Sequence, residues 1–230
     1  MFVSEIFYSI QGEGELAGVP SVFIRVSGCN LRCKWCDTKY ASWYPEGEEM
    51  SIDEVLTDVE FHNAKHVVLT GGEPMIARGI HDLARRIQAQ KMHVTIETAG
   101  TVLPEGIPCD LASISPKLKN ANPGKELSGS WRTRHDKLRW APEIAQEWTQ
   151  QYEYQLKFVV SHPHDMQEVE EYLQAIRIPV PPHKVLIMPE GKDIQEIKSH
   201  TDIVVGICKK SGYRFCNRLH VDLFGNTRGT

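Results

Sequence analysis

Short apolar runs alternate along the chain with longer stretches in which apolar residues recur at helical spacing. The short runs are rich in β-branched residues and are bounded by glycine, proline or polar residues, which is typical of buried strands. They predict six strands, over residues 21–27, 66–70, 93–98, 111–115, 155–160 and 184–188. The longer stretches predict five helices, over residues 51–62, 76–90, 137–151, 164–176 and 192–210. Ser51 and Glu54 form a capping-box pattern at the start of the first helix.

This alternation of strands and helices predicts a parallel α/β sheet. Six parallel strands and an extended segment at 215–224 fall short of the eight strands of a full β/α barrel, which usually takes about 250 residues. We therefore expect a partial, open TIM-like barrel of about six parallel strands, built as a single domain over residues 1–230. Residues 117–134 show no periodicity and predict a long loop, which is either functional or disordered.

The composition is that of an ordinary globular protein, and its charge favours small-molecule chemistry. The chain has 230 residues and a formal net charge of −4, with 26 Lys and Arg against 30 Asp and Glu. It has no long basic block, which disfavours nucleic acid or a membrane surface as its main partner, and the basic residues of 132–139 are most simply a solvated face. It has no run of 18 apolar residues and no secretory signal, so we expect a cytoplasmic protein.

Clusters of unusual residues follow nearly every predicted strand. They lie at Gly28-Cys29, Gly71-Gly72-Glu73-Pro74, Glu97-Thr98-Ala99-Gly100, Ser115-Pro116-Lys117, Ser161-His162 and Met188-Pro189-Glu190. Because the carboxyl ends of parallel strands lie on the same side of a sheet, we expect these clusters to converge on one site. Glycine and proline also punctuate ordinary loops. Loop punctuation does not account for the repeated Glu, Lys and Cys.

Three cysteines crowd into one predicted loop, where Cys29, Cys33 and Cys36 form a Cys-x3-Cys-x2-Cys pattern directly after the first strand. A structural zinc site takes four closed ligands, typically in two pairs, and no fourth Cys or His stands at that spacing. Three thiolates can instead hold a 4Fe-4S cluster and leave one iron open to another molecule. The spacing therefore favours an iron–sulfur cluster over zinc or free thiols. Buried structural thiols are expected for the other cysteines, Cys109, Cys208 and Cys216.

The cysteine loop and the Gly-Gly-Glu-Pro stretch at 71–74 together resemble the radical S-adenosylmethionine enzymes. The resemblance implies that the open iron binds the amino and carboxylate groups of S-adenosylmethionine and that the reduced cluster cleaves it to a 5'-deoxyadenosyl radical. It also implies an electron donor such as flavodoxin or ferredoxin. The residue chemistry agrees, because Gly71 and Gly72 allow close backbone approach to a ligand. Glu73 can accept a hydrogen bond from the ligand's ammonium group.

Further elements resemble one family of this group, the 7-carboxy-7-deazaguanine synthases of 7-deazapurine (queuosine) biosynthesis. They lie in order at 9–14, 23–26, 35–38, 97–98, 115–117, 156–160, 218–220 and 225–229. Members of that family take 6-carboxy-5,6,7,8-tetrahydropterin to 7-carboxy-7-deazaguanine by a radical-mediated ring contraction with loss of ammonia. The resemblance therefore implies a carbon–nitrogen lyase that regenerates its S-adenosylmethionine, and a homodimer.

The same resemblance assigns roles to single residues. It makes Cys29, Cys33 and Cys36 the cluster ligands. It also implies that six residues surround S-adenosylmethionine: Trp35, Asp37, Gly72, Glu73, Ser115 and Lys117. It implies that Thr38 is the protein ligand of a Mg²⁺ ion against the substrate carboxylate. It implies that a short N-terminal segment and the C-terminal tail help to bind the substrate, with Ile10, Gln11, Gly12, Glu13, Arg25, Thr70, Glu97 and Thr230. A pterin has a guanine-like edge and an acid, which suit Glu97 as an acceptor and Arg25 as a cation.

Two other interpretations stay open from the sequence. A glycyl-radical activating enzyme is also small and also carries a Cys-x3-Cys-x2-Cys loop, but it would act on a protein and would not need the Gln-Gly-Glu-Gly segment at 11–14. A module that binds a cluster or zinc for a structural role would not be an enzyme. Taken alone, Thr38 would more often be a turn hydroxyl and Arg25 a surface strand residue whose stem covers apolar area.

Overall fold

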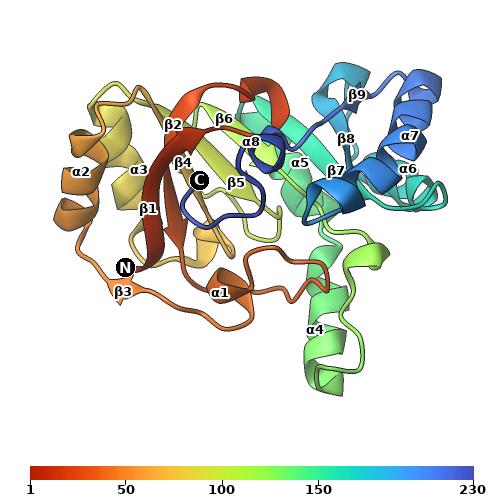
Figure 1. Cartoon of the computed structure of the whole chain (residues 1–230), viewed down its shortest axis with the longest axis horizontal. Coiled ribbons are helices and arrows are strands. Elements are labelled where there is room, and N and C mark those ends of the chain that lie inside the picture. Colours follow the sequence, from red (N-terminus) through yellow and green to blue (C-terminus); the bar gives the residue numbers. More distant parts are fainter.

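Nine strands form one open sheet in the computed structural model, which describes all 230 residues (Figure 1). In order across the sheet they are β3 (Glu48–Glu49), β1 (Phe2–Ile10), β2 (Pro20–Val26), β4 (His66–Gly71), β5 (His93–Thr98), β6 (Leu111–Ile114), β7 (Tyr154–Val160), β8 (Val185–Pro189) and β9 (Arg214–Phe215). The neighbours from β2 to β9 pair in parallel, whereas β1 is antiparallel to both of its partners. The six predicted parallel strands and the open, partial barrel are therefore confirmed.

Eight α-helices connect or follow the strands, with four short 3-10 turns between them (Figure 1). They are α1 (Lys39–Ser42), α2 (Ile52–Phe61), α3 (Ile80–Ala89), α4 (Gly129–Arg139), α5 (Pro142–Gln151), α6 (Asp165–Ala175), α7 (Ile194–Ser211) and α8 (Leu219–Phe224). The predicted capping box is present at α2, where Ser51 Oγ accepts from the Glu54 amide and the Glu54 carboxylate accepts from the Ser51 amide. No helix combines the length and the apolarity that crossing a membrane requires.

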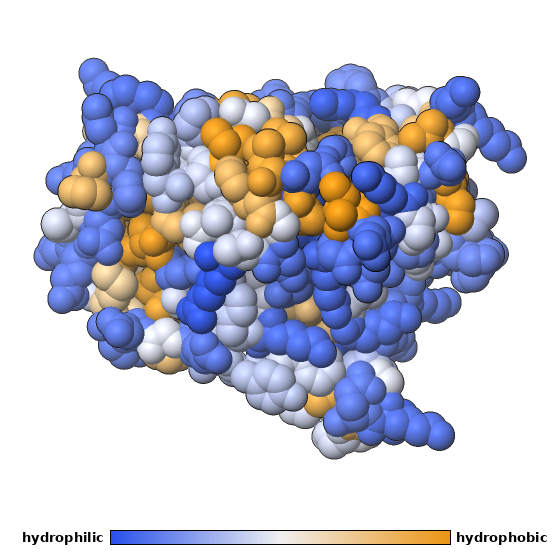
Figure 2. Space-filling model, in the orientation of Figure 1, coloured by the Kyte–Doolittle hydropathy of each residue, from blue (hydrophilic) through white to orange (hydrophobic).

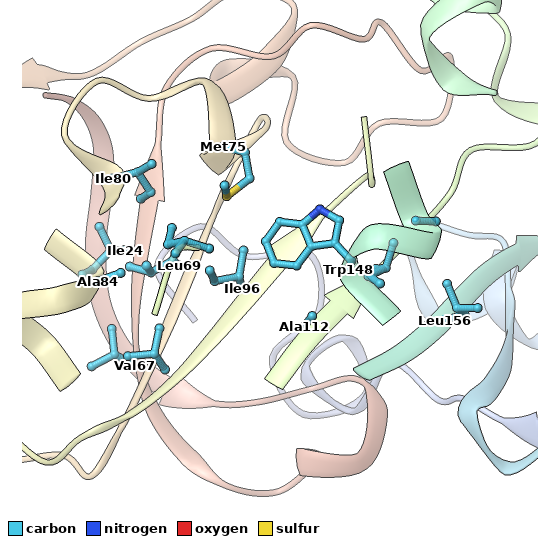
Figure 3. Close-up of a cluster of buried hydrophobic side chains, with 14 of the residues drawn as sticks. Ile24, Val67, Leu69, Met75, Ile80, Ala84, Ile96, Ala112, Trp148 and Leu156 are labelled. Carbon is cyan, nitrogen blue, oxygen red and sulfur yellow. The ribbon is translucent and has the colours of Figure 1, made fainter. Parts of the chain in front are cut away.

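The main core lies between the sheet and the helices that follow its strands. Ile24 of β2, Leu69 of β4 and Ile96 of β5 are fully buried there, beside Trp148 of α5 (Figure 3). The Trp148 indole N–H donates to the Val102 carbonyl oxygen at 2.9 Å, so the largest side chain of this core has its polar atom satisfied. Apolar burial over these strands is the main term that holds the sheet in register.

Side chains that alternate with the core residues point to the other face of the sheet, because successive strand residues face opposite ways. Arg25 of β2, Glu97 of β5 and Lys157 of β7 occupy such positions, and all three line one pocket. The period of two thus separates the apolar positions that fold the sheet from the polar positions that build a site.

Four sequence predictions are wrong in detail. The predicted helix over 137–151 is two helices, because α4 ends at Arg139 and Pro142 starts α5. Proline suits the first turn of a helix and cannot continue an existing one. The predicted loop over 117–134 holds a 3-10 turn and the start of α4. The predicted helix at 76–90 begins only at Ile80, and the predicted extended segment at 215–224 contains helix α8.

Candidate active site

A pocket of about 350 Å³ opens at the carboxyl ends of the parallel strands. The ends of β2 and of β4 to β8 contribute to its wall, together with the end of β1 and the C-terminal tail at 225–230. The residues predicted for the site that line it are Ile10, Gln11, Gly12, Glu13, Arg25, Cys29, Cys33, Trp35, Cys36, Asp37, Thr38, Thr70, Gly72, Glu97, Ser115, Lys117 and Thr230. Glu73 is the one predicted site residue that does not line the pocket.

The cysteine loop at 29–36 is held in place by hydrogen bonds to its backbone. Arg32 Nη1 donates to the Cys29 carbonyl oxygen at 2.7 Å, and the Trp43 indole donates to the Cys33 carbonyl oxygen at 3.0 Å. Cys36 Sγ lies 3.2 Å from Ser42 Oγ. These contacts hold the loop in place, and all three of its cysteines line the pocket.

Burial makes the thiols of Cys29 and Cys33 poor acids unless a cation is present. It raises the pKa of Cys29 to about 12 and also raises that of Cys33. Thiolates form when a metal supplies compensating charge. All three cysteines of the loop line the pocket, which suits the corners of an iron–sulfur cluster, because such clusters are held by cysteine thiolates.

The glycines at the end of β4 are needed for packing inside the protein. A Cβ on Gly72 would lie 2.1 Å from the Gly28 carbonyl oxygen, and one on Gly71 would lie 2.2 Å from the Val26 carbonyl oxygen. Any side chain at these positions would push the end of β4 away from the cysteine loop. These distances show a close approach between two segments of the chain. Gly71 and Gly72 also line the pocket, and their close approach to a ligand stays a prediction.

Glu73 is fully buried behind the pocket wall. Its carboxylate accepts hydrogen bonds from Thr98 Oγ1 at 2.8 Å, the Ala99 amide at 2.8 Å and the Met75 amide at 3.2 Å. Burial raises the pKa of Glu73 in spite of these donors. In this structure the side chain ties the end of β4 to the end of β5 and is not presented to a ligand in the pocket.

Lys117 forms a cationic corner of the pocket with an aromatic neighbour. Its Nζ donates to Ser115 Oγ at 2.8 Å and lies 5.6 Å from the centroid of the Trp35 ring. The Trp35 indole in turn donates to Asn120 Oδ1 at 3.3 Å. Three residues that the sequence placed around S-adenosylmethionine therefore contact one another beside the cysteine loop.

Arg218 joins the C-terminal segment to the centre of the pocket. Its Nη2 pairs with Asp37, its Nη1 donates to the Gly191 carbonyl oxygen, and its Nε lies 3.2 Å from Glu13 Oε1. Burial on its own would raise the pKa of Asp37, but the Arg218 guanidinium outweighs it and lowers that pKa. Arg218 was missed from the sequence, where the family resemblance covered segment 218–220 but gave Arg218 no role.

Lys157 stands between two carboxylates on the substrate side of the pocket. Its Nζ lies 2.7 Å from Glu13 Oε2 and 2.7 Å from Glu97 Oε2, and Gln11 Nε2 donates to Glu97 Oε1 at 3.3 Å. Burial on its own would lower the pKa of Lys157, but the two carboxylates outweigh it and raise it. Lys157 was also missed from the sequence, where a single Lys within an apolar strand gave no signal of its partners.

Arg25 reaches the pocket with one side of its guanidinium already bound. Glu5 Oε1 accepts from Arg25 Nε at 2.6 Å and from Tyr40 Oη at 2.6 Å. Glu5 Oε2 accepts from Arg228 Nε at 3.3 Å, and the Arg228 guanidinium lies 4.2 Å from the centroid of the Tyr40 ring. Glu5 therefore links Arg25 to the C-terminal tail, whose last residue, Thr230, lines the pocket.

The structure also shows the surroundings of Thr38, of His220 and of the three isolated cysteines. Thr38 precedes α1 as its N-cap residue, but its hydroxyl caps no backbone N–H and lies 3.7 Å from Cys36 Sγ. His220 lines the pocket and packs on Gly12, where a Cβ would lie 1.9 Å from its Nδ1. Cys208 and Cys216 are buried as predicted, whereas Cys109 is only half-buried.

Comparisons with known proteins show the family of this chain. Residues 23–117 match the Radical SAM superfamily. The chain is 42% identical to a 7-carboxy-7-deazaguanine synthase of Halobacterium salinarum, over 99% of this chain and 92% of the relative. It is also 42% identical to one of Rhodopirellula baltica, over 100% of this chain and 89% of the relative.

Among solved structures, QueE from Escherichia coli superposes with a TM-score of 0.66 at 25% identity, over 95% of this chain and 94% of that one. Sequence similarity and fold similarity thus extend over nearly the whole chain. The chain belongs to the 7-carboxy-7-deazaguanine synthases, within the Radical SAM superfamily.

Proposed function

We propose that this chain forms 7-carboxy-7-deazaguanine from 6-carboxy-5,6,7,8-tetrahydropterin, with ring contraction and loss of ammonia. One observation carries the proposal: a single pocket joins the three-cysteine loop to the hydrogen-bond acceptors held around Lys157. Family membership supports the same reaction. Family membership also argues against the two alternatives that the sequence left open, a glycyl-radical activating enzyme and a structural module that binds a cluster or zinc.

The cofactor half of the pocket fits a 4Fe-4S cluster and S-adenosylmethionine. Cys29, Cys33 and Cys36 would hold the cluster. When bound, the reduced cluster and S-adenosylmethionine supply the radical that starts the ring contraction. Lys117, held by Ser115, is a cation that suits the carboxylate of S-adenosylmethionine.

The other half of the pocket suits the pterin. Its amino and ring N–H groups need acceptors, and Lys157 holds the carboxylates of Glu13 and Glu97 side by side for that purpose. Arg25 lines the pocket and can pair with the substrate acid through the nitrogens that Glu5 does not use. The Thr38 hydroxyl makes no capping hydrogen bond, so it suits a Mg²⁺ ion that also binds the substrate and water.

Other parts of the proposal rest on the family resemblance or on the sequence alone. Homodimerisation, a flavodoxin-like or ferredoxin-like electron donor and a cytoplasmic location stay predictions. The substrate is a small molecule, and the radical reaction requires a reductant. These two facts do not identify the protein that donates the electron.

An anaerobic assay tests the proposed reaction. Cluster-loaded protein is incubated with 6-carboxytetrahydropterin, S-adenosylmethionine, Mg²⁺ and dithionite, and 7-carboxy-7-deazaguanine and 5'-deoxyadenosine are measured together by mass spectrometry. The expected result is product that requires every component. In Glu97→Gln, turnover efficiency should fall by about ten- to a hundredfold while the cluster and slow S-adenosylmethionine cleavage persist, since an acceptor for a buried substrate donor is weakened. Cleavage of S-adenosylmethionine by the wild-type protein without any product would overturn the proposal.

A further inference from the structure

Helix α4 and the turn before it form a positive region in an otherwise acidic chain. Segment 117–139 contains seven Lys or Arg against two Asp or Glu, a net charge of +5 in a chain of net −4, so the remainder carries −9. The 3-10 turn of this segment is Lys119–Ala121. A concentrated charge of this kind attracts partners of opposite charge and raises their association rate.

Three of the four positive side chains of α4 are exposed, and the fourth, Arg139, is buried and pairs with Asp136 and Glu168. The helix stands out from the body of the molecule, and its surface is mainly hydrophilic (Figures 1 and 2). Arg132, Arg134 and Lys137 are exposed. The one carboxylate within the helix, Asp136, is bound by Arg139 at 2.9 Å and so does not neutralise them. Lys119 and Lys125, which precede the helix, are exposed as well.

The opposite side of the same helix packs on the cysteine loop. His135 Nδ1 accepts a hydrogen bond from the Arg32 amide at 2.9 Å, and the Arg32 guanidinium lies 4.2 Å from the centroid of the Trp131 ring. Leu138 packs on the small apolar cluster that contains Cys33. These contacts recur at i, i+4 and i+7, as expected for one buried face of a helix. Helix α4 therefore separates the cysteine loop from the exposed positive face by its own width alone.

We propose that the exposed face of α4, with the turn at 119–125, docks an acidic electron-transfer protein that reduces the iron–sulfur cluster. The inference rests on the proposed function, because the electron needs a cluster at the cysteine loop. In this step the reduced flavin or iron–sulfur centre of the donor loses one electron and the oxidised cluster gains it, and no bond or proton is exchanged. A helix is about 10 Å across, so a donor seated on α4 lies about one helix diameter from the loop.

Two sets of variants with equal charge changes test the docking face. The first set reverses Arg132→Glu, Arg134→Glu and Lys137→Glu. The control set reverses three exposed lysines of α7, Lys198→Glu, Lys209→Glu and Lys210→Glu. A neutral version of the first set, with alanine at the three positions, separates loss of attraction from added repulsion. Circular dichroism checks that each protein is folded.

The binding measurement uses the cluster-loaded protein and an acidic flavodoxin, with the dissociation constant determined by calorimetry between about 0.05 and 0.5 M salt. The α4 reversal should weaken binding at least tenfold at low salt, the alanine version should weaken it less, and the differences should shrink as salt screens the charges. The α7 control should bind as wild type does. Equal weakening in both reversals would show an effect of net charge alone and overturn the proposal, as would unchanged binding in the α4 reversal.

A second readout follows the visible absorption of the cluster as it is reduced. Reduction by flavodoxin should slow at least tenfold in the α4 reversal, whereas reduction by dithionite, a small molecule, should be unchanged. If the α4 reversal instead abolishes binding of an RNA oligonucleotide and leaves flavodoxin unaffected, the face binds nucleic acid and the proposal is wrong. Flavodoxin-dependent reduction through α4 without any 7-carboxy-7-deazaguanine under dithionite would refute the proposed function and leave the docking face standing.

Discussion

Lys157 Nζ, from strand β7, lies 2.7 Å from a carboxylate oxygen of Glu97, from strand β5. The same ammonium lies 2.7 Å from Glu13, which precedes β2. Lys157 is only 2% exposed, so this is a buried cation with two anionic partners. The arrangement fixes the spacing of two carboxylates that we propose as acceptors for the pterin.

Replacing Lys157 by Met should leave Glu13 and Glu97 without their shared cation. Breaking a buried ion pair from one side typically costs about 3 to 5 kcal/mol, because the remaining charge stays desolvated. The free energy of unfolding, measured by urea denaturation, should fall by about that amount, and the KM for the carboxypterin should rise. Lys210→Met, at an exposed position of α7, should change neither quantity. A loss of stability below about 1 kcal/mol at Lys157 would contradict the expected burial cost.

Glu13 should make stability depend on pH in acid. Burial on its own would raise the pKa of Glu13, but Lys157 and Arg218 outweigh it and lower that pKa below the ordinary 4.5. A carboxylate with a depressed folded-state pKa stabilises the fold above its unfolded-state pKa and loses that contribution as pH falls through the folded value. The free energy of unfolding should therefore decrease as pH falls below about 4.5, by up to about 1.4 kcal/mol per pH unit from this group.

Urea denaturation at a series of acid pH values measures this slope. Glu13→Gln should reduce the slope, because glutamine binds no proton in either state, while Asp37, whose pKa is also lowered, still contributes to it. Glu105→Gln, at an exposed turn, should keep the wild-type slope. A wild-type slope in Glu13→Gln would show that Glu13 is not held ionised in the folded protein.

The clustered cysteines, and not the isolated ones, should bind iron. Cys33→Ala should remove bound iron and the near-visible absorption, because a cluster needs its protein thiolates. Cys208→Ala should retain both, since Cys208 lies in the main core away from the pocket lining. Iron analysis and absorption spectra of anaerobically prepared proteins measure the difference. About eight irons per chain, or tightly bound zinc, would be inconsistent with one 4Fe-4S site.

Thr38 should affect magnesium without affecting the cluster. Thr38→Ala removes a hydroxyl that makes no capping bond, so the fold should be unchanged. Cleavage of S-adenosylmethionine should persist, while the stimulation of product formation by Mg²⁺ should weaken. Product formation is titrated with Mg²⁺ in the wild type and in the variant. Identical titration curves would show that Thr38 is not the ligand.

Glu5 should control how Arg25 meets the substrate. Glu5→Gln keeps the shape of the side chain but removes the charge that binds Arg25 Nε at 2.6 Å. The KM for the carboxypterin should rise about tenfold, equivalent to about 1.4 kcal/mol, while S-adenosylmethionine cleavage is retained. Arg228→Ala should have a smaller effect, because that side chain is 46% exposed and exposed ion pairs contribute about 0 to 1 kcal/mol. A larger effect at Arg228 than at Glu5 would mean that the tail, and not Arg25, limits binding.

Local pattern was sufficient for much of the fold and for the cofactor half of the site. The apolar, β-branched runs predicted β2 and β4 to β8 to within a few residues. A strand that is buried in a parallel sheet is apolar along most of its length, so its own residues reveal it. The Cys-x3-Cys-x2-Cys loop and the Gly-Gly-Glu-Pro stretch were found because each motif lies within one short segment at a strand end. Parallel topology then brings these ends together without further information.

Elements that depend on distant partners were not predictable in this way. β1 was missed, and it is an edge-side strand whose burial comes from pairing with β2. The segment at 215–224 was predicted as extended, yet α8 forms there beside Arg218, whose partner Asp37 lies 181 residues away. The break between α4 and α5 follows from Pro142, a local signal that the helical periodicity on both sides obscured.

By itself, the amino-acid sequence determined which residues could fold into a parallel sheet and which short segments could hold a cluster, since strand period and cysteine spacing are properties of neighbours in the chain. Only the tertiary structure decided which charges meet. Lys157 pairs with Glu13 across 144 residues and with Glu97 across 60, and no local periodicity encodes such a contact. The physical reason is that a buried lysine is stable only where folding brings carboxylates to it, and that depends on the arrangement of the whole sheet.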